Sequence, residues 1–322
     1  MRKIIFAVMV CLMLVNTAIF AGGGRDRTFP SRNITMICPW AAGGGTDAVA
    51  RAIAIAAGRQ LGVTINVENR TGGGGGIGHA AIRNARPDGY TIGIATFELN
   101  PLSAQGLIDF SYRDFEPIVL LNSESAALTV PIGAPYNSLH EFAAFARANP
   151  GRLNISNSGP GSTQHIAAGL MEAAMGIQIT HIPFEGGSAP ALTALVGGHI
   201  DGSMMNLQEA MSQLHAGNVK TLGVMGHNRS ALFPDIPTFQ EQGFNITKYN
   251  WRGIVAPRGL DPAIRQTLVN AFSAAARDPE FISLMQTLNL SLTYLPADEF
   301  GRFMADNYNM VVTTLRDLGM VD

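Results

Sequence analysis

The residues best suited to bind an anion lie at positions 38–47, where the chain reads Cys-Pro-Trp-Ala-Ala-Gly-Gly-Gly-Thr-Asp. An apolar run at 34–38 precedes this stretch, and an alanine-rich helical pattern at 48–60 follows it. This order predicts a strand, a glycine turn and a helix. Backbone N–H groups are then exposed at the positive end of the helix dipole, where they can hold a carboxylate without Lys or Arg. We expect a binding site formed by Trp40, Ala42, Gly43, Gly44, Gly45, Thr46 and Asp47, in which Asp47 caps or braces the turn.

A second turn of the same kind follows a short predicted strand at 154–156 and precedes a helical pattern at 162–175. Each turn alone is also explained as an ordinary capped helix start. Two such turns, one in each predicted lobe, favour a binding site between them. The second half of this site is predicted at Ser158, Gly159, Gly161, Ser162 and Thr163. Four single residues could add contacts, although residues of this kind more often have a purely structural role: Thr96, Asn100, Phe184 and Asn206.

The glycine run at 72–78 supports a competing interpretation. Gly73, Gly75 and Gly78 fit the pattern G-x-G-x-x-G after a predicted strand at 64–69, and Glu98 lies twenty residues further on. This arrangement is typical of dinucleotide-binding turns, so an exported dinucleotide-binding enzyme is the alternative function. Five consecutive glycines match many patterns by chance, however, and a flexible, closely packed loop explains them as well.

Motifs for covalent catalysis or metal binding are missing from the sequence. It contains no G-x-S-x-G, no H-x-x-x-H and no obvious pair of carboxylates for acid–base work. Cys38 is the only cysteine after residue 21, so neither a disulfide nor a thiolate metal cluster is expected. We therefore expect a binding protein that is not an enzyme and has no metal and no cofactor.

The elements that must position these turns alternate between strand and helix along 322 residues, 47% of them apolar. This alternation predicts an α/β fold with mostly parallel sheets flanked by helices, in two lobes around a cleft. Lobe 1 is predicted to comprise residues 22–125 and 256–322, and lobe 2 residues 126–255, with crossovers near 126–131 and 251–257. Short strands are expected at 117–121, 126–131 and 254–256, and helices at 262–276, 279–288 and 297–319.

Residues 1–21 have the pattern of a secretory signal peptide. Arg2 and Lys3 precede an apolar stretch at 4–15, and small residues lead to a predicted cleavage site near Ala21. Removal of this segment changes the formal charge from −2 to −4 and leaves Lys220 and Lys248 as the only lysines. Such a composition does not suit nucleic acid or an anionic membrane, so we expect a periplasmic, soluble monomer.

The sequence resembles the Bug family, the substrate-binding proteins of tripartite tricarboxylate transporters. The resemblance covers nearly the whole chain after the signal peptide, in order, and is carried by residues 29–30, 34–47, 67–78, 87–91, 100–101, 158–162, 197–201, 234–243 and 251–257. It implies a two-lobed Venus flytrap of type II that closes on a carboxylate and delivers it to membrane transporter subunits. The family's ligands include di- and tricarboxylates, acidic amino acids and aromatic acids.

The resemblance also implies which residues hold the ligand, namely positions 42–47, Thr96 and positions 158–163, through main-chain amides and water and largely without a cation. Two positions depart from the family pattern. Glu185 stands where Lys or Arg is usual, and Glu98 lies in a normally small, polar stretch. If Glu98 lines the cleft, it favours a ligand with an amino group over a plain dianion. The sequence does not identify the ligand, nor whether the protein serves uptake or acts as a ligand receiver for a sensor kinase.

Overall fold

The computed structural model describes residues 28–184, 188–230, 233–288 and 290–321. The predicted signal peptide at 1–21 and Glu185 lie outside these residues. Within the described ranges, no helix has both the length and the apolar character needed to cross a membrane.

The first half of the molecule is built around three parallel strands. β1 (Ile34–Cys38) lies between β2 (Ile65–Asn69) and β3 (Thr91–Thr96). Helix α2 (Gly45–Leu61) connects β1 to β2, and the short helix η1 (Gly73–Gly75) and α3 (Gly76–Arg83) connect β2 to β3. These are the strand–turn–helix units that the sequence predicts, so the carboxyl end of β1 and the start of α2 meet at the predicted anion turn.

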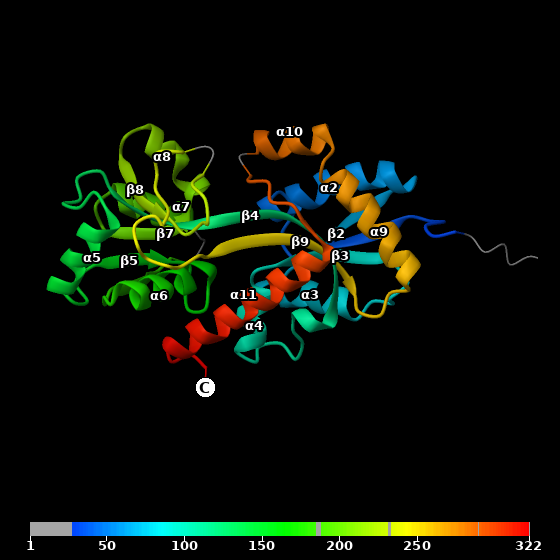
Figure 1. The fold of residues 1–322 in the computed structure, drawn as a ribbon, viewed down its shortest axis with the longest axis horizontal. Helices are drawn as coiled ribbons and strands as arrows, with labels where there is room; N and C mark the ends of the chain where they lie inside the picture. The colour runs from blue at the N-terminus through cyan, green and yellow to red at the C-terminus, as the bar shows by residue number, and fades with distance from the viewer. Residues whose placement is uncertain (1–27, 185–187, 231–232, 289, 322) are drawn as a thin grey trace, which may run out of the picture.

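Two long strands join the halves of the molecule. β4 (Phe115–Pro131) and β9 (Tyr249–Pro257) pair antiparallel and run side by side across the middle of the fold (Figure 1). Residues 115–125 of β4 pair with β9, whereas residues 126–131 pair with strands of the second half. The expectation of two short strands at 117–121 and 126–131 was therefore wrong, because 122–125 continue the ladder with buried polar side chains that break the apolar pattern.

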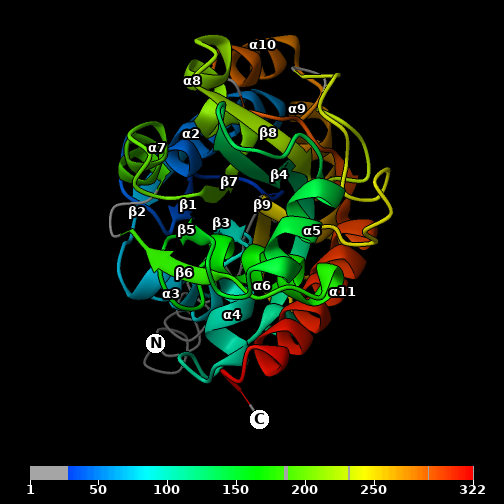
Figure 2. The same ribbon diagram turned by 90° about the vertical axis from the view of Figure 1, so that its left-hand side faces the viewer.

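The second half repeats the architecture. β5 (Asn154–Asn157) lies between β6 (Thr180–Pro183) and β7 (Gly202–Asn206), all parallel, and β4 pairs antiparallel with β7 and with β8 (Val219–Val224). Figure 2 views the molecule from this end and shows helices on both sides of the strands. The helices and the 3₁₀ turn of this half are α5 (Leu139–Ala148), α6 (Thr163–Met175), α7 (Ser188–Val196), η3 (Leu207–Ala210) and α8 (Met211–His215).

The C-terminal helices return to the first half. α9 (Pro262–Ala275) and α10 (Pro279–Thr287) pack with α2 over one face of the sheet. α11 (Ala297–Asp317) packs with α3 and with α4 (Leu99–Ala104), a helix that the sequence did not predict, on the other face. The far end of α11 reaches α6 of the second half (Figure 1). The remaining elements are η2 (Tyr112–Asp114) and β10 (Leu295–Pro296), which pairs with β4.

The α/β fold class is confirmed. Parallel strands form both flanks of the sheet, and β4 and β9 are antiparallel to their neighbours at its centre. The exact lobe boundaries at 125/126 and 255/256 remain a prediction.

Candidate functional site

The first glycine turn is held in place by Asp47. Its carboxylate is buried and accepts hydrogen bonds from Gly43 N (2.9 Å), Arg51 Nε (2.9 Å) and Asn69 Nδ2 (2.8 Å). Burial alone would raise the pKa of Asp47, but these hydrogen bonds together hold it below its ordinary value. The left-handed backbone at Gly43 (φ +81°) explains the glycine there. Asp47 therefore braces the turn, and its carboxylate is not free for a ligand.

The amides of this turn divide into two groups. Gly43 N donates to Asp47 and Gly44 N donates to the carbonyl of Ala41 (3.3 Å), so these two N–H groups are engaged inside the turn, contrary to the expectation that all of them face a ligand. Gly45 and Thr46 are the first two residues of α2, and within the described chain their amides donate to no acceptor. These two amides are available to an anion at the helix start, and so is the amide of Asp47, which likewise donates to no acceptor in the described chain.

A pocket of about 180 Å³ opens in front of this helix start. Trp40, Thr46 and Thr96, three of the predicted residues, line it. Trp40 Nε1 donates to Thr96 Oγ1 (3.3 Å), which fixes the indole as one wall. Glu98 also lines the pocket, which settles the question that the sequence left open for this residue. The other lining residues come from β9 and were not predicted as ligand contacts: Asn250, Trp251 and Arg252.

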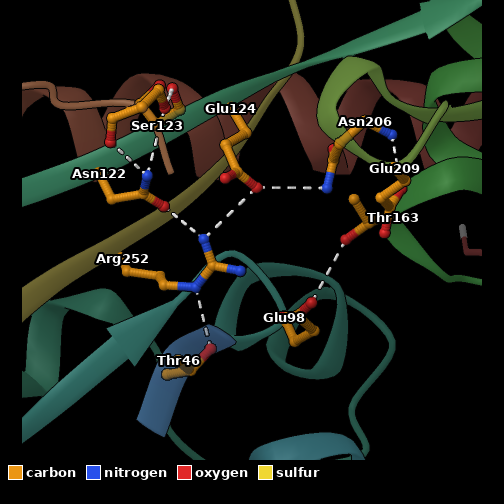
Figure 3. Close-up of polar contacts among 10 residues, drawn as sticks. Thr46, Glu98, Asn122, Ser123, Glu124, Thr163, Asn206, Glu209 and Arg252 are labelled. Atoms are coloured by element: carbon orange, nitrogen blue, oxygen red, sulfur yellow. Dashed lines mark hydrogen bonds and ion pairs between the residues drawn. The ribbon is translucent and has the colours of Figure 1, made fainter. Parts of the chain in front are cut away.

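Arg252 is the main difference from the cation-free site that the sequence suggested. Its Nε donates to Thr46 Oγ1 (2.9 Å), and its Nη1 donates to Asn122 Oδ1 and lies 3.5 Å from Glu124 Oε2. Among the described residues Nη2 has no hydrogen-bond partner, and Figure 3 shows it pointing into the space on the side of Glu98. Arg252 and the start of α2, which contributes Thr46, thus lie side by side in the pocket wall.

A buried acid lies behind the arginine. Glu124 is only 4% exposed, and its Oε1 has no hydrogen-bond partner in the described structure. Burial raises the pKa of Glu124, the Arg252 charge opposes that rise and the Glu209 charge adds to it. Asn206 Nδ2 lies 3.4 Å from Glu124 Oε2, so Asn206 contacts the pocket residues only through this acid (Figure 3).

The second glycine turn approaches the pocket through a single side chain. Thr163 Oγ1 donates to Glu98 Oε1 over 3.4 Å, which links α6 to the segment before α4 (Figure 3). The amides of Gly159 and Gly161 donate to Asn157 Oδ1 and His165 Nδ1 inside their own turn. The Gly161 amide is therefore engaged within its turn in this structure, and its predicted contact with a ligand stays a prediction. Ser162 caps α6 by accepting from His165 N, and Ser158 has no hydrogen bond within the described chain.

Three further predicted residues do not line the pocket. Asn100 is fully buried in α4, and within the described residues neither atom of its amide group has a partner. Phe184 packs against the small apolar cluster of Leu195, Ile200 and Val219 in the second half. Ala42 is exposed in the first turn and does not line the pocket.

The glycine run of the dinucleotide interpretation has a packing explanation. A Cβ at Gly78 would lie 2.5 Å from the Cα of Pro39 and 2.7 Å from the carbonyl oxygen of Arg70, so only glycine lets α3 approach that closely. Glu98, the acid that would bind a ribose, instead lines the pocket described above. No cluster of three or more His, Cys, Asp or Glu that could hold a metal occurs in the described ranges.

The comparison with known proteins identifies the family. Residues 49–320 match the family described as "Tripartite tricarboxylate transporter family receptor". A Cupriavidus necator protein named "UPF0065 protein in gbd 5'region" is 31% identical over 91% of this chain and 89% of its own length. The chain belongs to this receptor family, as the resemblance in its sequence implied.

Solved structures agree with this assignment. A TctC solute-binding protein from Polaromonas is 34% identical, with a TM-score of 0.84 over 90% of this chain and 99% of that one. MatC from Rhodopseudomonas palustris, solved with bound malate, is 28% identical, with a TM-score of 0.70 over 89% of this chain and 100% of that one. Family and fold are those of periplasmic solute-binding proteins.

Proposed function

We propose that this member of the receptor family binds a small carboxylate in the pocket between α2 and β9, without chemical change, and delivers it to the membrane subunits of a tripartite transporter. The observation that carries the proposal is the position of the first amides of α2 beside Arg252 at one end of the pocket. MatC, a relative over nearly the whole chain, is a malate-bound protein, which supports a carboxylate as the ligand class.

Burying a carboxylate requires several charge-assisted hydrogen bonds, because desolvation of the anion otherwise outweighs its attraction to the site. The amides of Gly45 and Thr46 and the free Nη2 of Arg252 can supply three. The helix dipole of α2 adds to them. This set replaces the original expectation that amides of both glycine turns grip the ligand.

The closing of two lobes on the ligand forms part of the proposal. β4 and β9 are the two connections between the halves, and the contact between Thr163 and Glu98 spans them at the pocket. A ligand that touches both halves favours the arrangement in which they meet, because it binds that arrangement better. We also propose export to the periplasm with cleavage near Ala21, which N-terminal sequencing of the mature protein would test.

Gly44→Val tests the site. A Cβ at Gly44 has ordinary contact with the carbonyl oxygen of Ala41 (3.4 Å), and its backbone is extended (φ −80°), so the variant should fold. The branched side chain should obstruct the helix start and weaken carboxylate binding by about tenfold or more. Gly133→Val is the matched control, since nothing lies within 4 Å of its Cβ position and it is not a pocket residue. Unchanged affinity of the Gly44 variant in calorimetric titration would contradict the proposed site.

A further inference from the structure

We propose that the ligand of this pocket carries a protonated amine as well as one carboxylate, so that the receptor selects a small zwitterionic amino acid over a dicarboxylate. The inference rests on the proposed function and narrows it to one ligand chemistry. The observations that carry it are the charged side chains at and behind the pocket wall, which are of opposite sign.

Glu98 supplies the negative side. It lines the pocket, yet the only hydrogen bond that its side chain makes in the described structure is the long one from Thr163 Oγ1 (3.4 Å). Glu98 occupies the N-cap position of α4, but its side chain makes no capping bond. The carboxylate of Glu98 therefore does not hold a turn in place, as the carboxylate of Asp47 does through its three hydrogen bonds. A carboxylate turned toward a small pocket with little else to bind is best satisfied by a ligand that donates hydrogen bonds and carries positive charge.

The protein's own nearby ammonium does not fill this role. Lys248 is 1% exposed, its Nζ lies 3.9 Å from the centre of the Phe97 ring, and within the described residues that nitrogen has no hydrogen-bond partner. The negative charge of Glu98 raises the pKa of Lys248, although burial lowers it by more, but Lys248 does not line the pocket. The lysine thus donates no hydrogen bond to Glu98, and the carboxylate remains open to a ligand.

Arg252 supplies the positive side. Its Nε is bound to Thr46 at the start of α2, so its guanidinium and the free helix amides converge on one anion. Glu124 lies 3.5 Å from Nη1 and keeps Oε1 unpaired, which places a second acid behind the same guanidinium. Figure 3 shows Arg252, Glu98 and Glu124 around one space, with Nη2 of Arg252 turned toward the side of Glu98.

This arrangement discriminates by charge. One ligand carboxylate binds Arg252 and the α2 amides. A second ligand carboxylate would lie near Glu98, where the two negative charges repel each other and each carboxylate loses bound water. An ammonium in that place receives a charge-assisted bond instead.

The experiment is a calorimetric titration of the full mature protein with glycine, alanine, β-alanine, γ-aminobutyrate, glycine betaine, succinate and malate. We expect one or more of the four primary amines to bind at least about tenfold more tightly than succinate and malate, since their ammonium donates a charge-assisted hydrogen bond to Glu98. Betaine has the charge without N–H donors and should be weaker than the best amine. Comparison of α- and ω-amino acids shows where the ammonium lies.

Glu98→Gln should reverse this preference, weakening the amines about tenfold or more and strengthening the dicarboxylates. Glu299→Gln makes the same change at an exposed position of α11 outside the pocket and should leave every affinity as it is. If wild type and Glu98→Gln both prefer a dicarboxylate, the zwitterion inference is overturned while the proposed function stands. If none of the seven compounds binds wild type, and tricarboxylates and aromatic acids fail as well, the proposed function is overturned and the inference with it.

Discussion

Replacing Lys248 by methionine should abolish a rise in stability with pH that the wild-type protein shows above neutral pH. Lys248 is completely buried against Phe97, and burial lowers the pKa of its ammonium from 10.5 to about 7, with the charges of Glu98 and Glu209 opposing the fall. The unfolded chain keeps an ordinary lysine pKa and so binds more protons than the native state above pH 7. Stability therefore increases with pH until the unfolded lysine also loses its proton.

The size of this effect follows from the two pKa values. Between about pH 7 and pH 8.5 the native ammonium goes from half to almost fully deprotonated while the unfolded one stays charged, which stabilises the native state by ~1.5 kcal/mol. Above that range burial of Cys38, which raises the pKa of its thiol, acts in the opposite direction. The window of pH 7 to about 8.5 isolates the lysine.

Urea denaturation followed by tryptophan fluorescence at several pH values in this window measures the effect. Wild type should gain stability with pH, and Lys248→Met should be flat and more stable than wild type at pH 7, because it removes a buried charge without a hydrogen-bond partner. Lys220→Met is the matched control, since Lys220 Nζ is bonded to Ala134 O and Asn137 Oδ1. That variant should keep the wild-type slope. A wild-type stability that is level or falls across the window would refute the reasoning.

Two further predictions concern the support of the pocket. His79 Nε2 accepts a hydrogen bond from Thr96 N (3.3 Å), and burial lowers the pKa of His79 to about 4. The free energy of unfolding should therefore fall by roughly 3 kcal/mol as the pH drops from the ordinary histidine pKa to 4. In urea titrations His79→Gln should lack this part of the loss of stability in acid. Asp47→Asn should reduce the free energy of unfolding by ~2 kcal/mol, because it weakens three hydrogen bonds to one buried carboxylate. The control Glu68→Gln, which removes a surface ion pair with Arg70, should change that free energy by less than ~0.5 kcal/mol. If Asp47→Asn and Glu68→Gln lost the same free energy of unfolding, the hydrogen bonds of Asp47 would contribute no more than a surface ion pair does.

Much of the fold was predictable because local patterns match the final elements. The apolar run at 34–38, the glycine turn and the alanine-rich stretch became β1 and α2 (Gly45–Leu61) within about two residues. Ser138 caps α5, as its position before a helical pattern indicates. These features depend on neighbours within a few residues, so a linear pattern contains them.

The central strands were harder to predict because their polar residues are satisfied by distant partners. Asn122 and Glu124 look like a loop between two short strands, but Asn122 Nδ2 donates to Ser291 O (2.6 Å) and Glu124 lies beside Arg252. These partners are more than 100 positions away in the sequence. A polar residue in a strand is interpretable only when its partner is known.

The sequence by itself determined the family, the α/β class and the position of the first glycine turn between β1 and α2, because these follow from motifs and periodicities along the chain. Only the tertiary structure decided which groups form the pocket wall. In the folded protein the amides of Gly43 and Gly161 donate hydrogen bonds within their own turns. Arg252 of β9 donates to Thr46, and Glu98 lines the same pocket. The physical reason is that burial and charge pairing depend on distances in space, and residues 46, 98 and 252 become neighbours only when the sheet forms.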